Sequence, residues 1–112
     1  MIRWLPLLAA LSGAMAVSAG AFGAHGATGK AAEWLRTGAE YQMVHAAAAL
    51  AVIALAGARV PAWLFVGGSF VFAGTLYAMA LGAPRWLGAV TPLGGLALIA
   101  GWLALAVTLA RG

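Results

Sequence analysis

Four long runs of apolar residues constrain the fold of this chain more than any other feature. A helix needs about 20 apolar residues to cross a hydrocarbon core about 30 Å thick. The runs cover residues 4–24, 40–57, 62–81 and 92–110. Of the 112 residues, 65% are hydrophobic and 7% are charged, whereas a soluble domain carries about 25% charged residues. We therefore predict an all-α fold, a four-span transmembrane helical bundle that forms a single membrane domain over residues 1–112.

The first run has an alternative interpretation as a secretory signal peptide. Arg3 precedes the apolar stretch, and Ala19-Gly20-Ala21 resembles a cleavage site. The run is about 21 residues long, whereas the apolar region of a signal peptide has about 7–15 residues. We therefore interpret it as a membrane span.

Four spans place both termini and the turn around Arg59 on one side of the membrane, called side A, and the other two connections on side B. The basic residues are divided equally: side A carries Arg3, Arg59 and Arg111, and side B carries Lys30, Arg36 and Arg85. The positive-inside rule therefore selects no orientation. The net charge of +4 comes from single, scattered residues, which are typical of interfacial anchors and not of a nucleic-acid-binding patch.

The segment between the first two runs has an amphipathic helical pattern. Its apolar face is formed by Ala31, Trp34, Leu35 and Gly38, and its polar face by Lys30, Glu33, Arg36 and Thr37. This pattern predicts a short interfacial helix between spans 1 and 2. The helix would serve as an in-plane connector, or else as a lid or a docking surface.

Polar residues cluster near side B. Because polar groups inside hydrocarbon are costly unless they are paired, such residues are the first candidates for a functional site. The predicted cluster contains His25, Glu40, Tyr41, Gln42, His45, Tyr77 and Thr91. Two interpretations remain open: a hydrogen-bonded network that ties helices together, or a binding site that also uses the positive helix ends on side B.

No catalytic, metal or cofactor motif accompanies this cluster. The chain has no cysteine, and the spacing of His25, Glu33, Glu40 and His45 does not indicate a metal site. The two histidines are not at matching depth for haem ligation. The serines at 12, 18 and 69 lie in apolar runs, where hydroxyls usually bond to the helix backbone. We therefore expect neither enzymatic activity nor a cofactor.

Small residues recur on the runs at helical spacing, a pattern that lets membrane helices approach closely. They are Ala9, Gly13, Ala16 and Gly20 in the first run, Gly67, Gly68 and Gly74 in the third, and Ala97 and Gly101 in the fourth. Trp102 lies in the middle of the fourth run. A tryptophan at that depth is expected to pack against another helix or to donate its N–H there.

Several sequence blocks resemble the small membrane proteins of the YgdD and transmembrane protein 256 family, known as domain of unknown function 423. They are GAFGAHG at 20–26, EYQMVHA at 40–46, FAGTLY at 72–77, LGAVTPLGG at 87–95 and GW at 101–102. Thr75 replaces the serine expected in the third block and keeps the hydroxyl. The resemblance implies a multi-pass bacterial inner-membrane protein of about four helices and supplies no established activity.

These observations favour a non-enzymatic structural or accessory membrane protein. Its expected partners are the lipid bilayer and either further copies of itself or a larger membrane complex. The alternative is a binder or transporter of a lipid, a quinone or a proton-coupled small solute, with Glu40 and His45 as titrating groups.

Overall fold

The computed structural model describes residues 3–112, and within that range every regular element is a helix. The elements are α1 (Trp4–His25), α2 (Gly29–Val52), α3 (Arg59–Ala80), the 3₁₀ helix η1 (Arg85–Ala89) and α4 (Thr91–Ala110). Three segments are long and apolar enough to cross a membrane: α1, α3, and η1 with α4. The longest dimension of the molecule, 46 Å, exceeds the hydrocarbon thickness of about 30 Å.

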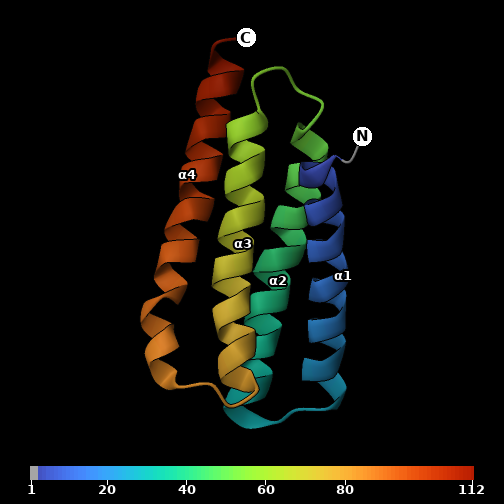
Figure 1. Ribbon diagram of the computed structural model, residues 1–112, viewed down its shortest axis with the longest axis vertical. Helices are drawn as coiled ribbons and strands as arrows, with labels where there is room; N and C mark the ends of the chain where they lie inside the picture. Colours follow the sequence, from blue (N-terminus) through green and yellow to red (C-terminus); the bar gives the residue numbers. More distant parts are fainter. Residues whose placement is uncertain (1–2) are drawn as a thin grey trace.

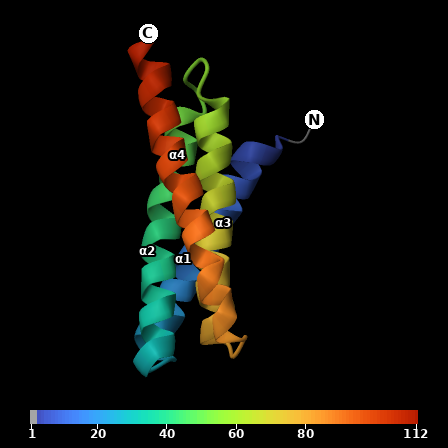
Figure 2. The same ribbon diagram turned by 90° about the vertical axis from the view of Figure 1, so that its left-hand side faces the viewer.

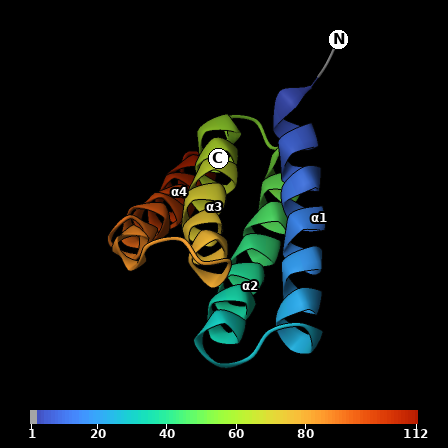
Figure 3. The ribbon, with the colours of Figure 1, turned by 60° about the horizontal axis from the view of Figure 1, so that its bottom comes forward.

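The four long helices run alternately up and down (Figure 1). Both termini and the α2–α3 connection lie at one end, which corresponds to side A, and the other two connections lie at the opposite end. The main contacts join helices that are consecutive in the chain, so α2 and α3, which each contact two long helices in this way, form the centre. Figures 2 and 3 show α1 and α4 on opposite flanks of this pair. Because the outer helices do not close on one another, one face of α3 stays open between them.

Helix α2 differs from the sequence prediction. Instead of a short interfacial helix followed by a separate span, a single helix runs from Gly29 to Val52. The residues assigned to the interfacial helix, Lys30, Glu33, Trp34 and Arg36, occupy its first two turns. The prediction of a separate interfacial helix was therefore wrong for the described fold.

The reason for this continuity is an unbroken stripe of buried residues along α2. The stripe comprises Ala32, Leu35, Gly38, Ala39, Gln42, His45, Ala46, Ala49 and Val52. Their spacing of three or four residues keeps them on one helical face. Gly38, which belongs to the predicted apolar face of this segment, is buried, and a Cβ there would lie 2.6 Å from the Tyr77 ring. The glycine serves helix packing, and burial of the stripe stabilises the whole helix.

The ends of α2 and α4 also differ in detail from the prediction. α2 ends at Val52, five residues before the predicted end of the second run. The fourth run is predicted to begin at residue 92, whereas α4 begins at Thr91 and Val90 occupies the N-cap position. The Thr91 hydroxyl donates to the Leu87 carbonyl at 3.3 Å, so it does not cap the helix.

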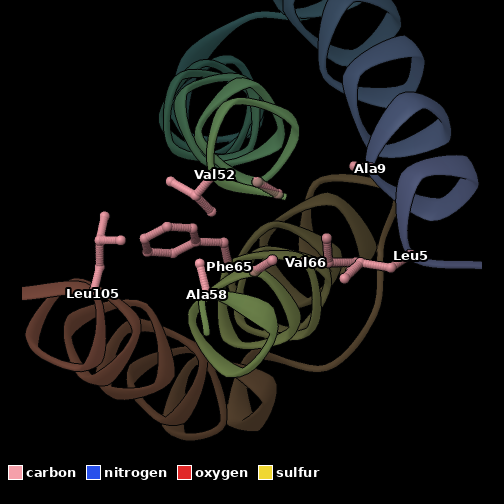
Figure 4. Close-up of a cluster of buried hydrophobic side chains, with 9 residues drawn as sticks. Leu5, Ala9, Val52, Ala58, Phe65, Val66 and Leu105 are labelled. Carbon is pink, nitrogen blue, oxygen red and sulfur yellow. The ribbon is translucent and has the colours of Figure 1, made fainter. Parts of the chain in front are cut away.

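A hydrophobic core fills the side-A half of the molecule around Phe65 of α3, which is fully buried (Figure 4). Side chains from all four long helices contribute to it. In Figure 4 the Phe65 ring points toward Val52 and Leu105, and Val66 points toward Leu5 on α1. The other members of the cluster are Ala9, Ala49, Ala58 and Ala62. The high share of alanine means that the helix backbones approach closely and little side-chain volume separates them.

Glycines produce the closest helix contact, between α3 and α4. A Cβ built on Gly94 would lie 2.4 Å from the Phe72 backbone nitrogen, and one on Gly68 would lie 3.0 Å from the Gly94 carbonyl oxygen. A Cβ built on Gly101 would likewise lie 2.8 Å from the Phe65 ring. The predicted close approach is thus present here, whereas Gly67 has no atom within 4 Å of its Cβ position and lies on the open face of α3.

Candidate functional site

Gln42 lies at the centre of a buried polar network that joins three helices. Its side chain is fully buried. Its amide nitrogen donates to Ser12 Oγ of α1 at 2.9 Å and to the Met15 sulfur at 3.3 Å. Its amide oxygen accepts a hydrogen bond of 2.7 Å from the Tyr77 hydroxyl of α3. An amide has two donors and one acceptor oxygen, so every polar atom of Gln42 is paired inside the protein.

The local sequence explains why these partners meet. Ser12 belongs to the stripe on α1 that faces α2, together with Leu5, Ala9, Ala16 and Gly23. The Tyr77 ring lies over Gly38, one turn before Gln42 on α2, because that residue has no side chain. The small residues thus bring the backbones close enough for the short Ser12 hydroxyl to reach the glutamine.

His45, one turn further along α2, connects to α4. Its Nδ1 lies 2.6 Å from the Tyr41 carbonyl oxygen, and its Nε2 accepts a hydrogen bond of 2.9 Å from Trp102 Nε1. A carbonyl can only accept and an indole N–H can only donate. Both contacts are therefore satisfied by the neutral imidazole with its proton on Nδ1. The bond confirms the prediction that Trp102 uses its N–H within the membrane.

Aromatic rings surround His45. The Phe65 and Trp102 rings lie 5.5 and 5.8 Å from the imidazole, centroid to centroid, each edge to face. The Tyr41 ring packs on Phe72 at 4.8 Å. Between α2 and α4, the side chains of Tyr41, His45, Phe72 and Trp102 border a groove of about 400 Å³ that opens toward the outside of the bundle. The site is consequently a polar contact set in an apolar, aromatic surface.

The tautomer of His45 can be tested directly. In protein labelled with ¹⁵N at histidine, we expect the His45 Nδ1 signal to be of the protonated type and the Nε2 signal of the unprotonated type. Trp102→Phe should shift the Nε2 signal and leave the proton on Nδ1, because the Tyr41 carbonyl remains. The exposed His25 is an internal reference. A His45 proton found on Nε2 would contradict the described geometry.

A third polar contact lies nearer side B, between α3 and α4. The Thr75 and Thr91 hydroxyls are 2.5 Å apart. Thr75 also lies 2.9 Å from the Val71 carbonyl oxygen of its own helix. This threonine is the residue that replaces serine in the resemblance described above, and its hydroxyl takes part in an interhelical hydrogen bond.

The predicted cluster is therefore only partly assembled. Gln42 and Tyr77 bond to each other, and His45 contacts the Tyr41 carbonyl oxygen. The side-chain partners of His45 and Thr91, which are Trp102 and Thr75, lie outside the predicted cluster. Tyr41 contributes its carbonyl and its ring, and its side chain is about half exposed. The side chains of His25 and Glu40 are exposed and take part in no hydrogen bond found among residues 3–112.

The predicted interfacial residues lie apart from this network. Lys30, Glu33 and Arg36 are exposed on the first turns of α2. Trp34 is half-buried, and the Arg85 guanidinium carbon lies 5.8 Å from its ring centroid, within the range of a cation–π contact. This contact joins the start of α2 to η1. Within the described range, no three His, Cys, Asp or Glu side chains converge as metal ligands would.

Ser12 and Thr75 are partners that the sequence interpretation missed. Ser12 was expected to bond to its own helix backbone, as Ser18 and Ser69 do in the structure. The signal that could have identified it is its place in the small-residue stripe of α1, between Ala9 and Ala16. A hydroxyl on a close-packed face is within reach of the neighbouring helix.

Comparison with known proteins identifies one family profile and several related membrane proteins. The profile of the family described as "Protein of unknown function (DUF423)" matches residues 19–95. The "UPF0382 membrane protein" of Haemophilus influenzae is 42% identical over 111 residues, covering 88% of this chain and 87% of the relative. The "UPF0382 inner membrane protein YgdD" of Escherichia coli K12 is 38% identical over 110 residues, covering 89% and 84%. A Staphylococcus epidermidis relative, also called a UPF0382 membrane protein, is 40% identical and covers 90% of each chain.

No solved structure matches the chain. The relatives are membrane proteins by name, and the structure contains apolar helices able to cross a bilayer. The protein is accordingly a multi-pass protein of the bacterial inner membrane. The family profile covers more than half of the chain and the matches extend over most of it, so this chain belongs to the DUF423 family of membrane proteins.

Proposed function

We propose that the protein is a non-enzymatic structural or accessory component of the membrane, built from four spans. It would act by presenting a rigid helical surface to further copies of itself or to another membrane subunit. The observation that carries this proposal is the internal pairing of its buried polar side chains, which makes them part of the framework.

The fourth span in this proposal is α2. Its first half is too polar for α2 to be identified as a span by hydropathy. Among residues 3–112, the segments that are long and apolar enough are α1, α3 and η1 with α4. However, α1 ends at side B and α3 begins at side A. If α1 and α3 both cross the bilayer, α2 must cross it too, because it connects those ends and packs between the two helices.

The pairing of the polar residues supports a structural role. Among residues 3–112, no buried side-chain nitrogen or oxygen lacks a hydrogen-bond partner. The Gln42 network ties α1, α2 and α3, and the His45–Trp102 bond ties α2 to α4. Groups whose hydrogen bonds are all made within the chain have little capacity left for a substrate, and they orient the helices instead.

A surface suited to a partner helix lies on the open face of α3. Gly67 and Gly74, two turns apart, have no atom within 4 Å of their Cβ positions. The side chain of Val71, between them, is 40% exposed. Small residues at this spacing allow another helix to approach closely in lipid. A second copy or a foreign subunit packed here would use a face that the chain itself leaves uncovered.

Purification from native membranes in mild detergent tests this role. We expect the protein to elute as a complex with further copies or another subunit, with the mass measured by light scattering and native mass spectrometry. Gly67→Leu with Gly74→Leu should release the monomer, because leucine blocks the approach of a helix. Ala106→Leu on the exposed face of α4 is the matched control. A monomeric wild-type protein would contradict the proposal.

A second candidate, a binder of a lipid or quinone, is favoured by one observation. The groove between α2 and α4 is bordered by Tyr41, His45, Phe72 and Trp102 and opens outward, as suits a flat apolar ligand. Glu40 and His45 also border a shallow hollow on the outer face of α2. This candidate predicts pH-dependent binding or flux in proteoliposomes that Glu40→Gln abolishes. The structural role instead predicts that His45→Ala loosens packing without changing any flux.

A further inference from the structure

The side-A end of the molecule contains a hollow that the polar network does not use. It lies between the start of α1, the α2–α3 connection and the start of α3, and its volume is about 510 Å³. Arg3 and Arg59 both border it. Trp4, Trp63 and Leu55 supply the apolar part of its wall. A hollow with two guanidinium groups and two indoles combines charge with apolar surface at one end of a membrane protein.

The charge of this hollow has no acidic counterpart nearby. The chain has only two acidic side chains, Glu33 and Glu40, and both lie in the first half of α2 toward side B. Arg3 and Arg59 are exposed at the opposite end. Guanidinium groups bind phosphate oxygens through paired N–H donors. The hollow is therefore complementary to an anionic, phosphate-like group.

The tryptophans indicate the depth of the hollow in the bilayer. Trp4 is 58% exposed and Trp63 is 40% exposed, although both are large and largely apolar. Tryptophan is enriched at the membrane–water interface, where the indole lies at headgroup level. Two such side chains beside two arginines place the hollow at the level of the lipid phosphates.

The N-terminal ends of two helices add to the positive charge of the hollow. α1 and α3 both begin at this hollow, and neither has an acidic residue in its first turn or a side-chain cap. Their positive dipole ends and unpaired backbone N–H groups thus face the same region as the arginines.

We propose that this hollow binds the phosphate of an anionic phospholipid. Arg3 and Arg59 contact the phosphate oxygens, while Trp4, Trp63 and Leu55 pack against the glycerol and the first part of the acyl chains. The occupant is a lipid and not a free anion, because the wall combines arginines with apolar side chains and lies at the interface. A polar anion would leave those apolar side chains in water.

The test compares lipids on the full-length protein. Native mass spectrometry in detergent should detect bound phosphatidylglycerol in preference to phosphatidylcholine. Because a basic residue near an anionic lipid surface contributes about 1 kcal/mol, Arg3→Gln and Arg59→Gln should each weaken phosphatidylglycerol binding about fivefold, and the double variant about 25-fold. Arg111→Gln, which removes an equal charge from the same side but not from the hollow, should have a much smaller effect.

Three results would overturn the proposal. If Arg111→Gln weakened phosphatidylglycerol binding as much as Arg3→Gln or Arg59→Gln does, the binding would reflect a general attraction to anionic membranes. If phosphatidylcholine bound as tightly as phosphatidylglycerol, the charge of the lipid would not contribute to binding. Displacement of phosphatidylglycerol by millimolar inorganic phosphate would indicate a site for the free anion. The substituted arginines are exposed, so the variants should fold, and an unchanged helical circular dichroism spectrum serves as the check.

Discussion

Replacing Gly94 by alanine is expected to destabilise the protein by about 3 kcal/mol, whereas the same change at Gly95 should be neutral or slightly stabilising. The added methyl group at Gly94 would meet the Phe72 nitrogen at 2.4 Å and the Gly68 carbonyl oxygen at 2.8 Å. Both are backbone atoms of α3, which no side-chain rotation can move away. The two helices would have to separate, and the loss of close packing would extend along their contact.

Gly95 is the matched control because it is the next residue of the same helix. A Cβ there would lie 3.7 Å from the Phe72 ring, an ordinary van der Waals contact. Alanine has a higher helix propensity than glycine by about 1 kcal/mol, so Gly95→Ala removes no contact and stiffens α4. Unfolding in mixed dodecyl maltoside and SDS micelles, followed by circular dichroism, measures both free energies. If the two variants unfold alike, α3 and α4 are not as close as described.

The second large effect is expected at Gln42. Gln42→Ala should lower the free energy of unfolding by about 2–3 kcal/mol, because it leaves the Tyr77 hydroxyl without its acceptor and opens a cavity. Met43→Ala is the control, since the neighbouring Met43 side chain is 43% exposed and is expected to face lipid. The same micelle unfolding assay applies, with Trp fluorescence as a second signal.

Two further variants separate hydrogen bonding from volume at this position. Gln42→Leu keeps most of the volume and removes all three hydrogen bonds. A double-mutant cycle with Tyr77→Phe should give a coupling between the average of about 0.6 kcal/mol and the maximum of about 1.7 kcal/mol measured for hydrogen bonds between membrane helices. If Gln42→Leu is as stable as the wild type, the network fixes the helix register without adding stability.

Much of the architecture could be predicted because, in a bilayer, the local sequence largely determines where each helix begins and ends. The runs at 4–24 and 62–81 correspond closely to α1 and α3, since an apolar helix in a bilayer ends where polar or turn-forming residues begin. The position of Trp102 in the middle of an apolar run predicts that it packs against another helix or donates its N–H there, and the structure contains both contacts. These predictions require only the position of a residue along its own helix, and therefore its depth in the bilayer.

The sequence predictions fail where the conformation or the partner of a residue depends on a neighbouring helix. The polar segment before Glu40 resembles a surface connector, but α2 continues through it because the stripe ending in Val52 is buried along its length. Gly38 belongs to the predicted apolar face, but its contact with the Tyr77 ring depends on how α2 packs against α3. Ser12 could not be paired with Gln42 without the register between α1 and α2. Each case depends on contacts between helices, which depth alone does not specify.

The order of helix packing has a consequence for how the protein is made. The main contacts join helices that are consecutive in the chain, so each helix after the first meets a partner that is already inserted when it enters the bilayer from the ribosome. Assembly need not wait for the C-terminal segment, and few distant pairings must be searched for. The bond between His45 of α2 and Trp102 of α4 joins helices that are not consecutive. It can form only after the last helix has arrived and therefore marks the completed molecule.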